Sequence, residues 1–431
     1  MTYNPTNDNT LGGIKAWMVW ACAALFYCYQ YIIRVSPNVM TEDLMQAFSI
    51  DATALGVIVA FYYYAYAGMQ LPMGALMDRF GPGLILSFAS FVCAAACFIF
   101  SATNDATSAS LARFMMGLGS ACGWLGILKL GTLWFRPQQL GKVIGFTMTL
   151  GTVGAATGGL PLEFLIDCVG WRKSMVIIGV VGMAIGALIF ITARNTPPTL
   201  PEKSFSDAGN ETIGFLEGIK CVIFSRQVWM LGIYAMLMYV PLTILGDLWG
   251  VPFIQKFYLI DEKFAAPVVS FLFVGIACGS PVFAMLSDRF ESRKIPLFLG
   301  ALATLLIYCA IFFIPGIPLT LMYALFFLVG FFFPAQCLCF AAVCEITPLN
   351  ASGLVIGFIN MVVMLSGVVF HPLVGKLLDL NSNHLLSDGI PMYELADFRI
   401  ALSIIPLCLG GAFILSFFIH ETYPKTQAST N

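Results

Sequence analysis

Twelve apolar runs, each about twenty residues long, limit what this chain can fold into. A helix needs about 20 residues to cross the ~30 Å hydrocarbon core of a bilayer, where the backbone must satisfy its own hydrogen bonds. Hydrophobic residues make up 59% of the chain and charged residues only 10%, far from the composition of soluble proteins. The sequence therefore predicts an all-α integral membrane protein with twelve transmembrane helices. The predicted spans are residues 15–38, 53–77, 84–103, 109–135, 141–165, 172–193, 227–250, 267–287, 295–315, 318–343, 353–377 and 399–420.

Two short motifs recur at nearly the same offset along the chain. An acid–base pair between two apolar runs, Asp78–Arg79, returns about 210 residues later as Asp288–Arg289, and residues 141–146 return as residues 353–358. Two matches at one offset indicate two copies of a six-helix unit, arranged as two pseudo-symmetric bundles. A parallel repeat of this kind places a solute site between the copies near the membrane midplane. We predict an N-terminal bundle over 1–194, a polar, proline-rich cytoplasmic linker over 195–226 and a C-terminal bundle over 227–431.

Charge and cysteine usage narrow the functional classes. A net charge of −2 and the lack of a basic tract argue against a nucleic-acid partner. Lys and Arg concentrate in the loops on the side of the N-terminus, which predicts two cytoplasmic termini in a bacterial inner membrane. Most cysteines lie inside apolar runs as small hydrophobes, and no complementary ligand accompanies them, so we expect no metal and no cofactor. No clustered acid, base or metal site suggests an enzyme.

Several segments resemble signatures of the major facilitator superfamily, and the resemblance covers essentially the whole chain. The loop signature GxxxDRxG is complete at Gly74, Asp78, Arg79 and Gly81. Residues 112–119 resemble the RxxxG segment of helix four, residues 133–137 the exit from that helix, and residues 170–172 the entry to helix six. The resemblance implies a transporter that works by alternating access between the two bundles.

The charged loop residues are then predicted to act as a conformational switch. Acid and base groups at helix ends can form charge-assisted hydrogen bonds in one state and release them in the other. For the loop pairs the alternative is a determinant of topology, and for Arg113 it is an arginine that reaches the lipid headgroups. The predicted switch residues are Gly74, Asp78, Arg79, Arg113, Asp288 and Arg289.

Arg34 is the residue of the first span that is most costly to place in a membrane, at least about 2.5 kcal/mol if unpaired. Tyr27, Tyr31 and Arg34 share one helical face, with Gln30 beside it. The planar guanidinium suits a carboxylate or a phosphate. The position resembles the helix-one arginine of the family's organic-anion symporters, which is implied to hold a solute carboxylate, although Ile33 and Ser120 stand where those relatives carry acids.

Snorkelling to the headgroups is the alternative for Arg34, and for Lys129 as well. Uncharged hydrogen-bonding groups on later helices complete the predicted solute site. Its further members are Lys129, Tyr234, Tyr239, Gln336 and Asn360. Possible proton carriers are Glu163, Asp247, Glu345 and His371, while facilitated diffusion without a proton stays open.

The sequence thus predicts a monomeric secondary transporter, embedded in lipid, that binds a small-molecule solute and, where transport is coupled, a co-transported proton. Residues 34–40 and 61–70 resemble a bacterial nutrient-uptake branch that includes amino-acid transporters of intracellular pathogens. The main prediction is therefore import, by symport or facilitated diffusion, of a small carboxylate-bearing nutrient such as an amino acid. The alternatives are a larger organic anion such as a siderophore, polycarboxylate or sugar phosphate, an efflux protein, or a receptor that binds its solute without moving it.

Overall fold

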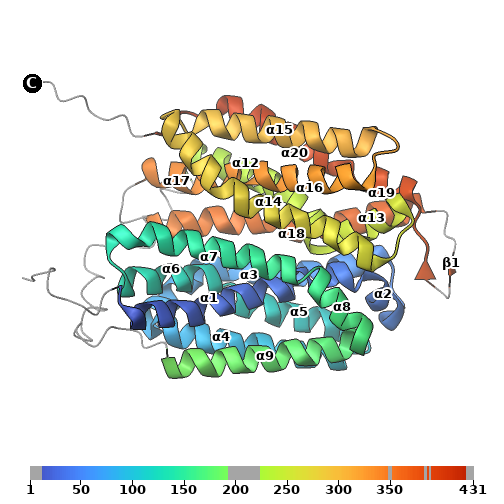
Figure 1. Ribbon diagram of the computed structural model, residues 1–431, viewed down its shortest axis with the longest axis horizontal. Helices are drawn as coiled ribbons and strands as arrows, with labels where there is room; N and C mark the ends of the chain where they lie inside the picture. The colour runs from blue at the N-terminus through green and yellow to red at the C-terminus, as the bar shows by residue number, and fades with distance from the viewer. Residues whose placement is uncertain (1–11, 193–223, 348–351, 383–385, 388–389, 424–431) are drawn as a thin grey trace, which may run out of the picture.

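The computed structural model describes residues 12–192, 224–347, 352–382, 386–387 and 390–423. Within these residues the chain forms long helices that run side by side, and the N-terminal half packs against the C-terminal half (Figure 1). The linker predicted over 195–226 lies, apart from its last residues, outside the described residues. The exact boundaries of the two bundles therefore remain a prediction.

Twelve helices of the described chain are long and apolar enough to cross a membrane, which confirms the predicted fold class. They match the twelve predicted windows, and the largest difference is in the seventh span, which continues to Tyr258 instead of ending near residue 250. The spans are Ile14–Val39, Ala52–Gly74, Pro82–Ala102, Ala106–Trp134, Lys142–Val169, Trp171–Thr192, Arg226–Tyr258, Glu262–Arg289, Lys294–Phe313, Leu319–Glu345, Gly353–Asn381 and Leu395–Phe418.

The first bundle contains the elements before the linker. They are α1 (Ile14–Val35), η1 (Ser36–Val39), α2 (Thr41–Phe48), α3 (Ala52–Phe80), α4 (Pro82–Ala102), α5 (Ala106–Ser120), α6 (Gly123–Trp134), α7 (Pro137–Thr157), α8 (Leu160–Val169) and α9 (Trp171–Thr192). Proline at the start of α4 and α7, together with Gly81 at a positive φ of 81°, forms the tight turns between consecutive spans.

The second bundle follows the linker. Its elements are α12 (Arg226–Pro241), η3 (Leu242–Trp249), α13 (Gly250–Tyr258), α14 (Glu262–Arg289), α15 (Lys294–Phe313), α16 (Leu319–Phe332), η4 (Phe333–Cys337), α17 (Leu338–Glu345), α18 (Ser352–Asn381), β1 (Leu386–Ser387), β2 (Ile390–Pro391), α19 (Leu395–Leu402) and α20 (Ile404–Phe418). The two short strands pair antiparallel in the loop between the last two spans.

The seventh span changes helix type in its interior. Segment η3 is π-helical, and Pro241 and Pro252 flank it. A Cβ on Gly250 would lie 2.0 Å from the carbonyl oxygen of Leu245, so only glycine allows this turn to come so close to the carbonyl five residues before it. The seventh span thus contains an irregular turn, a feature often found at functional sites.

We call the side where α1 begins the inner side, following the predicted orientation, and the side where α1 ends the outer side. In Figure 1 the inner ends of the helices lie on the left and the outer ends on the right. The seam between α3 and α18 joins the two bundles along their length, and α7 with α14 forms a second seam.

Glycines along the α3–α18 seam show that the bundles pack most closely on the outer side. A Cβ added to Gly375 would lie 2.2 Å from the backbone oxygen of Ala52. A Cβ added to Gly56 would lie 2.4 Å from the backbone oxygen of His371. Further in, the nearest atom to such a Cβ at Gly357 is 3.5 Å away, and at Gly74 and Gly353 nothing lies within 4 Å. The structure is therefore closed on its outer side, and these two helices pack less tightly toward the inner side.

Candidate functional site

The outer end of α1 places Arg34 between the two bundles. Arg34 is only 4% exposed, so it does not reach toward headgroups. Its Nε and Nη2 atoms donate to Oδ2 of Asp247 in η3 at 3.1 and 2.9 Å, and Nε also donates to the Tyr63 hydroxyl of α3 at 3.1 Å. Tyr63 donates a short hydrogen bond to the same Oδ2 atom. A buried ion pair thus links the first bundle to the second.

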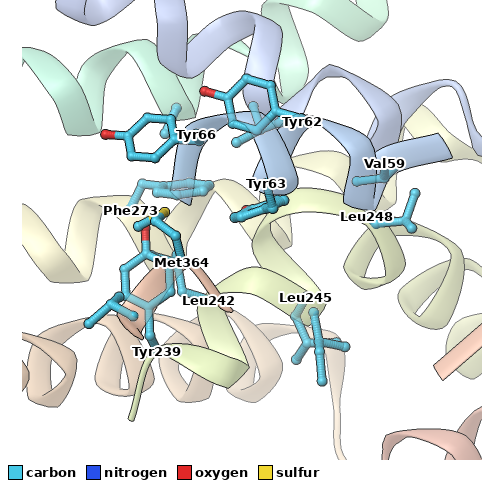
Figure 2. Close-up of a cluster of buried hydrophobic side chains, with 14 of the residues drawn as sticks. Val59, Tyr62, Tyr63, Tyr66, Tyr239, Leu242, Leu245, Leu248, Phe273 and Met364 are labelled. Carbon is cyan, nitrogen blue, oxygen red and sulfur yellow. The ribbon is translucent and has the colours of Figure 1, made fainter. Parts of the chain in front are cut away.

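Three tyrosine rings surround the Arg34 guanidinium. Its central carbon lies 5.4 Å from the ring centres of Tyr31 and Tyr63 and 5.3 Å from that of Tyr239. Such contacts stabilise a cation that has lost its water, each by roughly 0.5–2 kcal/mol. Figure 2 shows Tyr63 and Tyr66 of the first bundle in one cluster with Tyr239 and Leu242 of the second. The arrangement holds a positive charge at the junction of the bundles.

A second arginine, Arg113 of α5, supports this centre from behind. It is 1% exposed and donates to the backbone oxygens of Ile33 at 2.7 Å and Arg34 at 3.4 Å. Its guanidinium lies 5.0 Å from the ring of Tyr62. Arg113 therefore fixes the end of α1 from within the same bundle, and its burial disagrees with an arginine at the headgroups. We call Arg34, Tyr63, Arg113 and Asp247 the arginine centre.

Asn38 in η1 holds the irregular turn of the seventh span. Its Nδ2 donates to the backbone oxygens of Leu245 at 2.9 Å and Gly246 at 2.8 Å, and its Oδ1 accepts from the Val251 amide at 2.9 Å. A π-helical turn leaves such groups without their regular partners, so one side chain of the first bundle supplies them. The outer closure and the shape of η3 therefore depend on each other.

A second outer contact joins α18 to the beginning of α3. Asp379 accepts from the backbone amides of Ala52 at 3.3 Å and Thr53 at 2.8 Å. The hydroxyls of Thr53 and Tyr393 donate short hydrogen bonds to the same carboxylate. A carboxylate is favourable at a helix N-terminus, where free amides and the helix dipole meet it.

The other predicted solute ligands of the first span lie inward of Arg34. The Tyr27 and Tyr31 hydroxyls are 3.5 Å apart, and Tyr31 is only half buried. Gln30 is 3% exposed and lies against Gly123. On the α3–α18 seam, Nδ2 of Asn360 donates to Oε1 of Gln70 at 2.8 Å, so a second polar pair crosses between the bundles.

The remaining predicted ligands are more dispersed. Tyr234 is fully buried and donates to the Leu297 oxygen at 2.6 Å, which points it into the second bundle. Gln336 lies buried in η4 and accepts from the thiol of Cys337. Lys129 lies half-buried on α6. The structure thus brings Tyr31 and Tyr239 together with Arg34 but does not bring Tyr234 there.

Two of the predicted proton carriers, Asp247 and His371, lie at the arginine centre, and the other two, Glu163 and Glu345, lie away from it. Asp247, which the sequence places near the outer end of its span, is fully buried because the span continues well beyond it. His371 of α18 is fully buried, and its ring centre lies 5.3 Å from that of Tyr63. Glu163 lies in α8, and Glu345 pairs with Arg293 at 2.8 Å inside the second bundle.

The predicted switch residues of the two loops differ in their surroundings. The side chain of Asp78 lies outside the described residues, and Arg79 is exposed beside Phe80. Arg289 is also exposed. Asp288 instead lies 3.7 Å from Arg293, so in the second bundle Asp288 pairs with Arg293 and not with the adjacent Arg289.

Glu421 closes the inner end of the second bundle near this loop. Its carboxylate accepts hydrogen bonds from the Ser292 hydroxyl and from the backbone amides of Arg293, Lys294 and Tyr423. Burial alone would raise the pKa of Glu421, but these hydrogen bonds outweigh it and lower the pKa to about 2.

The sequence did not single out four residues of this interface: Asn38, Tyr63, Gln70 and Asp379. Only Tyr63 carried a signal, because it belongs to a run of tyrosines that cannot all face one side of a helix. The other three act through backbone groups or through side chains of the opposite bundle, which no local pattern reveals.

Comparison with known proteins now decides the family. The family model described as Major Facilitator Superfamily matches residues 19–371 and 250–430. The chain belongs to this superfamily. As a major facilitator protein it is a multi-pass membrane transporter and not an enzyme, which confirms those predictions.

Three similar major facilitator proteins have names that describe their activities. The chain is 27% identical over 311 residues to the "Probable L-galactonate transporter" of Escherichia coli, covering 67% of each chain. It is 22% identical to the "Membrane sensor protein UhpC" of Salmonella typhimurium, over 80% of each chain. It is also 22% identical to the "Probable hexose phosphate transport protein" of Chlamydia pneumoniae, over 64% of this chain and 65% of that protein. Two other relatives are matched over only 39% and 42% of their own length.

Solved major facilitator structures share the fold. A bacterial homologue of the human lysosomal transporter Spinster, in an inward-facing and occupied conformation, superposes with a TM-score of 0.75. The match covers 93% of this chain and 96% of that chain at 16% identity. At this identity the likeness establishes the twelve-helix fold alone.

Proposed function

We propose that this major facilitator protein transports an organic anion of the sugar-acid or sugar-phosphate type and binds its negative group at Arg34. The observation that carries the proposal is a buried guanidinium between the bundles, held by Asp247 and three tyrosines. A buried arginine binds a carboxylate or phosphate through charge-assisted, bidentate hydrogen bonds. The contact between bundles at this point would link solute binding to their relative motion.

The relatives favour this substrate class over the amino acid that the sequence alone suggested. The names of the related proteins mention L-galactonate and hexose phosphate, both of which are organic anions with several hydroxyl groups. Tyrosine hydroxyls and the amides of Gln30, Gln70 and Asn360 offer hydrogen bonds for such hydroxyls. We propose import across a bacterial inner membrane, with the predicted cytoplasmic side as the inner side.

Flux into liposomes tests the proposal. Purified protein would be reconstituted and tested for uptake of L-galactonate, glucose 6-phosphate and L-serine. We expect uptake of at least one of the two sugar anions and loss of more than about tenfold in Arg34→Ala, because an anion that loses its charged partner in a buried site loses several kcal/mol. Arg34→Lys should retain part of the activity, since an ammonium keeps the charge but lacks the planar guanidinium that binds an anion through two hydrogen bonds.

Arg172 offers the matched control. Its guanidinium donates to the backbone oxygens of Ser101 and Thr103 in an outer loop, away from the arginine centre. Arg172→Ala should therefore leave the uptake of the solute near wild type in correctly inserted protein. Full activity of Arg34→Ala, or equal losses in both variants, would remove Arg34 from the site.

If transport uses a proton, we propose that the proton acts at Asp247 and His371. Of the predicted carriers, Asp247 belongs to the arginine centre and His371 lies beside it. Asp247→Asn and His371→Gln should then uncouple uptake from an imposed pH gradient, whereas Glu163→Gln should not. Uptake that ignores the gradient in the wild-type protein would show facilitated diffusion instead.

A sensor that binds its solute without moving it is the second candidate function. It is favoured by the similarity to a membrane sensor protein over 80% of the chain. Measuring equilibrium binding and liposome flux on the same sample separates the two, because a sensor binds the anion and shows no flux.

A further inference from the structure

The arginine centre contains an uneven set of charges. Arg34 and Arg113 are cations, Asp247 is an anion, and the neighbouring His371 carries no charge in its neutral form. With His371 neutral, the described groups of the centre sum to one net positive charge. Uncompensated charge is costly in a buried site, so the missing partner is one negative charge.

Asp247 occupies only one edge of the Arg34 guanidinium. The carboxylate contacts only the edge of the guanidinium formed by Nε and Nη2, and it does so through a single oxygen, Oδ2. An arginine has a second edge, formed by its two Nη atoms, that binds a carboxylate in the same bidentate way. The Nη1 and Nη2 atoms of Arg113 already donate to the backbone oxygens of Ile33 and Arg34, so Arg34 is the arginine of the centre that we assign to the solute carboxylate.

The other oxygen of Asp247 has no donor. Oδ1 is buried and accepts no hydrogen bond from any described residue. Buried carboxylate oxygens are normally satisfied, so an atom of this kind indicates a donor that comes from outside the protein. A solute hydroxyl next to the bound carboxylate would satisfy it.

We infer that the solute is a monoanionic hydroxy acid, with its carboxylate on Arg34 and a hydroxyl on Asp247, and that Asp247 discriminates against more negative solutes. This inference rests on the proposed function and refines it. A monoanion balances the charge of the centre, a neutral polyol leaves it unbalanced, and a dianion adds a second negative charge that the centre does not balance. Repulsion of a like charge is a common source of specificity.

Four open-chain, six-carbon solutes test this inference with little change in size. Galactitol is neutral, L-galactonate carries one negative charge, and galactarate carries two. Hexanoate carries one charge but no hydroxyl group. At pH 7 all of these carboxyl groups are ionised. Binding to purified wild-type protein should favour L-galactonate over each of the other three by at least about tenfold.

Asp247→Asn changes the charge of the site while keeping its shape. In this variant the ratio of L-galactonate affinity to galactarate affinity should fall by at least about tenfold, because the centre then carries two net positive charges, which a dianion balances. Asp379→Asn is the matched control, since Asp379 of α18 is also an acid between the bundles but bonds to the start of α3 and not to Arg34. It should leave the ratio of affinities unchanged.

The outcomes separate this inference from the proposed function. Equal binding of L-galactonate and galactarate by the wild-type protein overturns the inference, and so does a ratio that Asp247→Asn leaves unchanged. The wild-type series needs no variant, so misfolding of Asp247→Asn cannot hide the result. If none of the four binds, the inference fails, while uptake of glucose 6-phosphate that depends on Arg34 would still support the proposed function.

Discussion

Replacing Asn38 with alanine should open the outer side of the protein. Asn38 is 3% exposed, and its three hydrogen bonds to η3 and α13 cross from one bundle to the other. They exist only while the outer side is closed, so their loss destabilises that state relative to one in which the outer side is open.

The size of the effect follows from the bonds themselves. A hydrogen bond of this kind contributes roughly 1 kcal/mol net, so three of them contribute about 3 kcal/mol. A difference of that size shifts the ratio of outer-closed to outer-open protein by roughly a hundredfold. Asn38→Asp should open the protein at least as far, because a carboxylate placed beside the oxygens of Leu245 and Gly246 is repelled by them.

Distances between spin labels on the two bundles measure this shift. Gln46 and Leu259 are exposed on the outer side of the first and second bundle, and the exposed Cys168 and Cys278 would first be replaced by serine. We expect a longer distance to gain population in Asn38→Ala.

Asn381→Ala is the matched control, because its amide donates to Leu377 within the same helix. The wild-type protein could be so fully closed that a hundredfold shift leaves the distances unchanged. The measurement is therefore repeated in an Asp379→Asn background, in which the outer side is less firmly closed and the effect of Asn38→Ala is visible. The reasoning is refuted if Asn38→Ala and Asn381→Ala give the same distances in both backgrounds.

Three other predictions follow from the described contacts. Gly375→Ala should slow transport severalfold in a flux assay, because its Cβ would collide with α3 in the outer-closed state, whereas Gly353→Ala has open space and should be near wild type. Glu421→Gln should lower the melting temperature at pH 7. The pKa of Glu421, about 2, lies below the usual 4.5, so its stabilisation is complete above pH 4.5 and disappears as the pH falls through 2. The melting temperatures of the wild type and the variant, plotted against pH, should therefore converge near pH 2. Arg293→Ala leaves Glu345 without its cation, so it should cost roughly 2 kcal/mol and lower the melting temperature in detergent by several degrees, while Lys256→Ala should not.

The sequence was sufficient to locate the spans but not the contacts between the bundles. Long apolar runs mark transmembrane helices because the bilayer requires them of any sequence, and all twelve are found. The cost of Arg34 also predicted that it has a partner. The choice of partner depends on how two separate bundles meet, and Arg34 and Asp247 are 213 residues apart in the chain.

The placement of Asp247 shows why the site was harder to predict than the fold. A window of about twenty residues ends the seventh span near residue 250, so an acid at 247 looks like a residue at the membrane surface. The span in fact reaches Tyr258, because a π-helical turn and the following α13 extend it, and the acid is carried into the interior. That turn is possible because Gly250 lacks a side chain and Asn38 of the other bundle satisfies its backbone. The position of the central acid thus depends on a contact between bundles, and a change at Asn38 should alter solute affinity as well as opening.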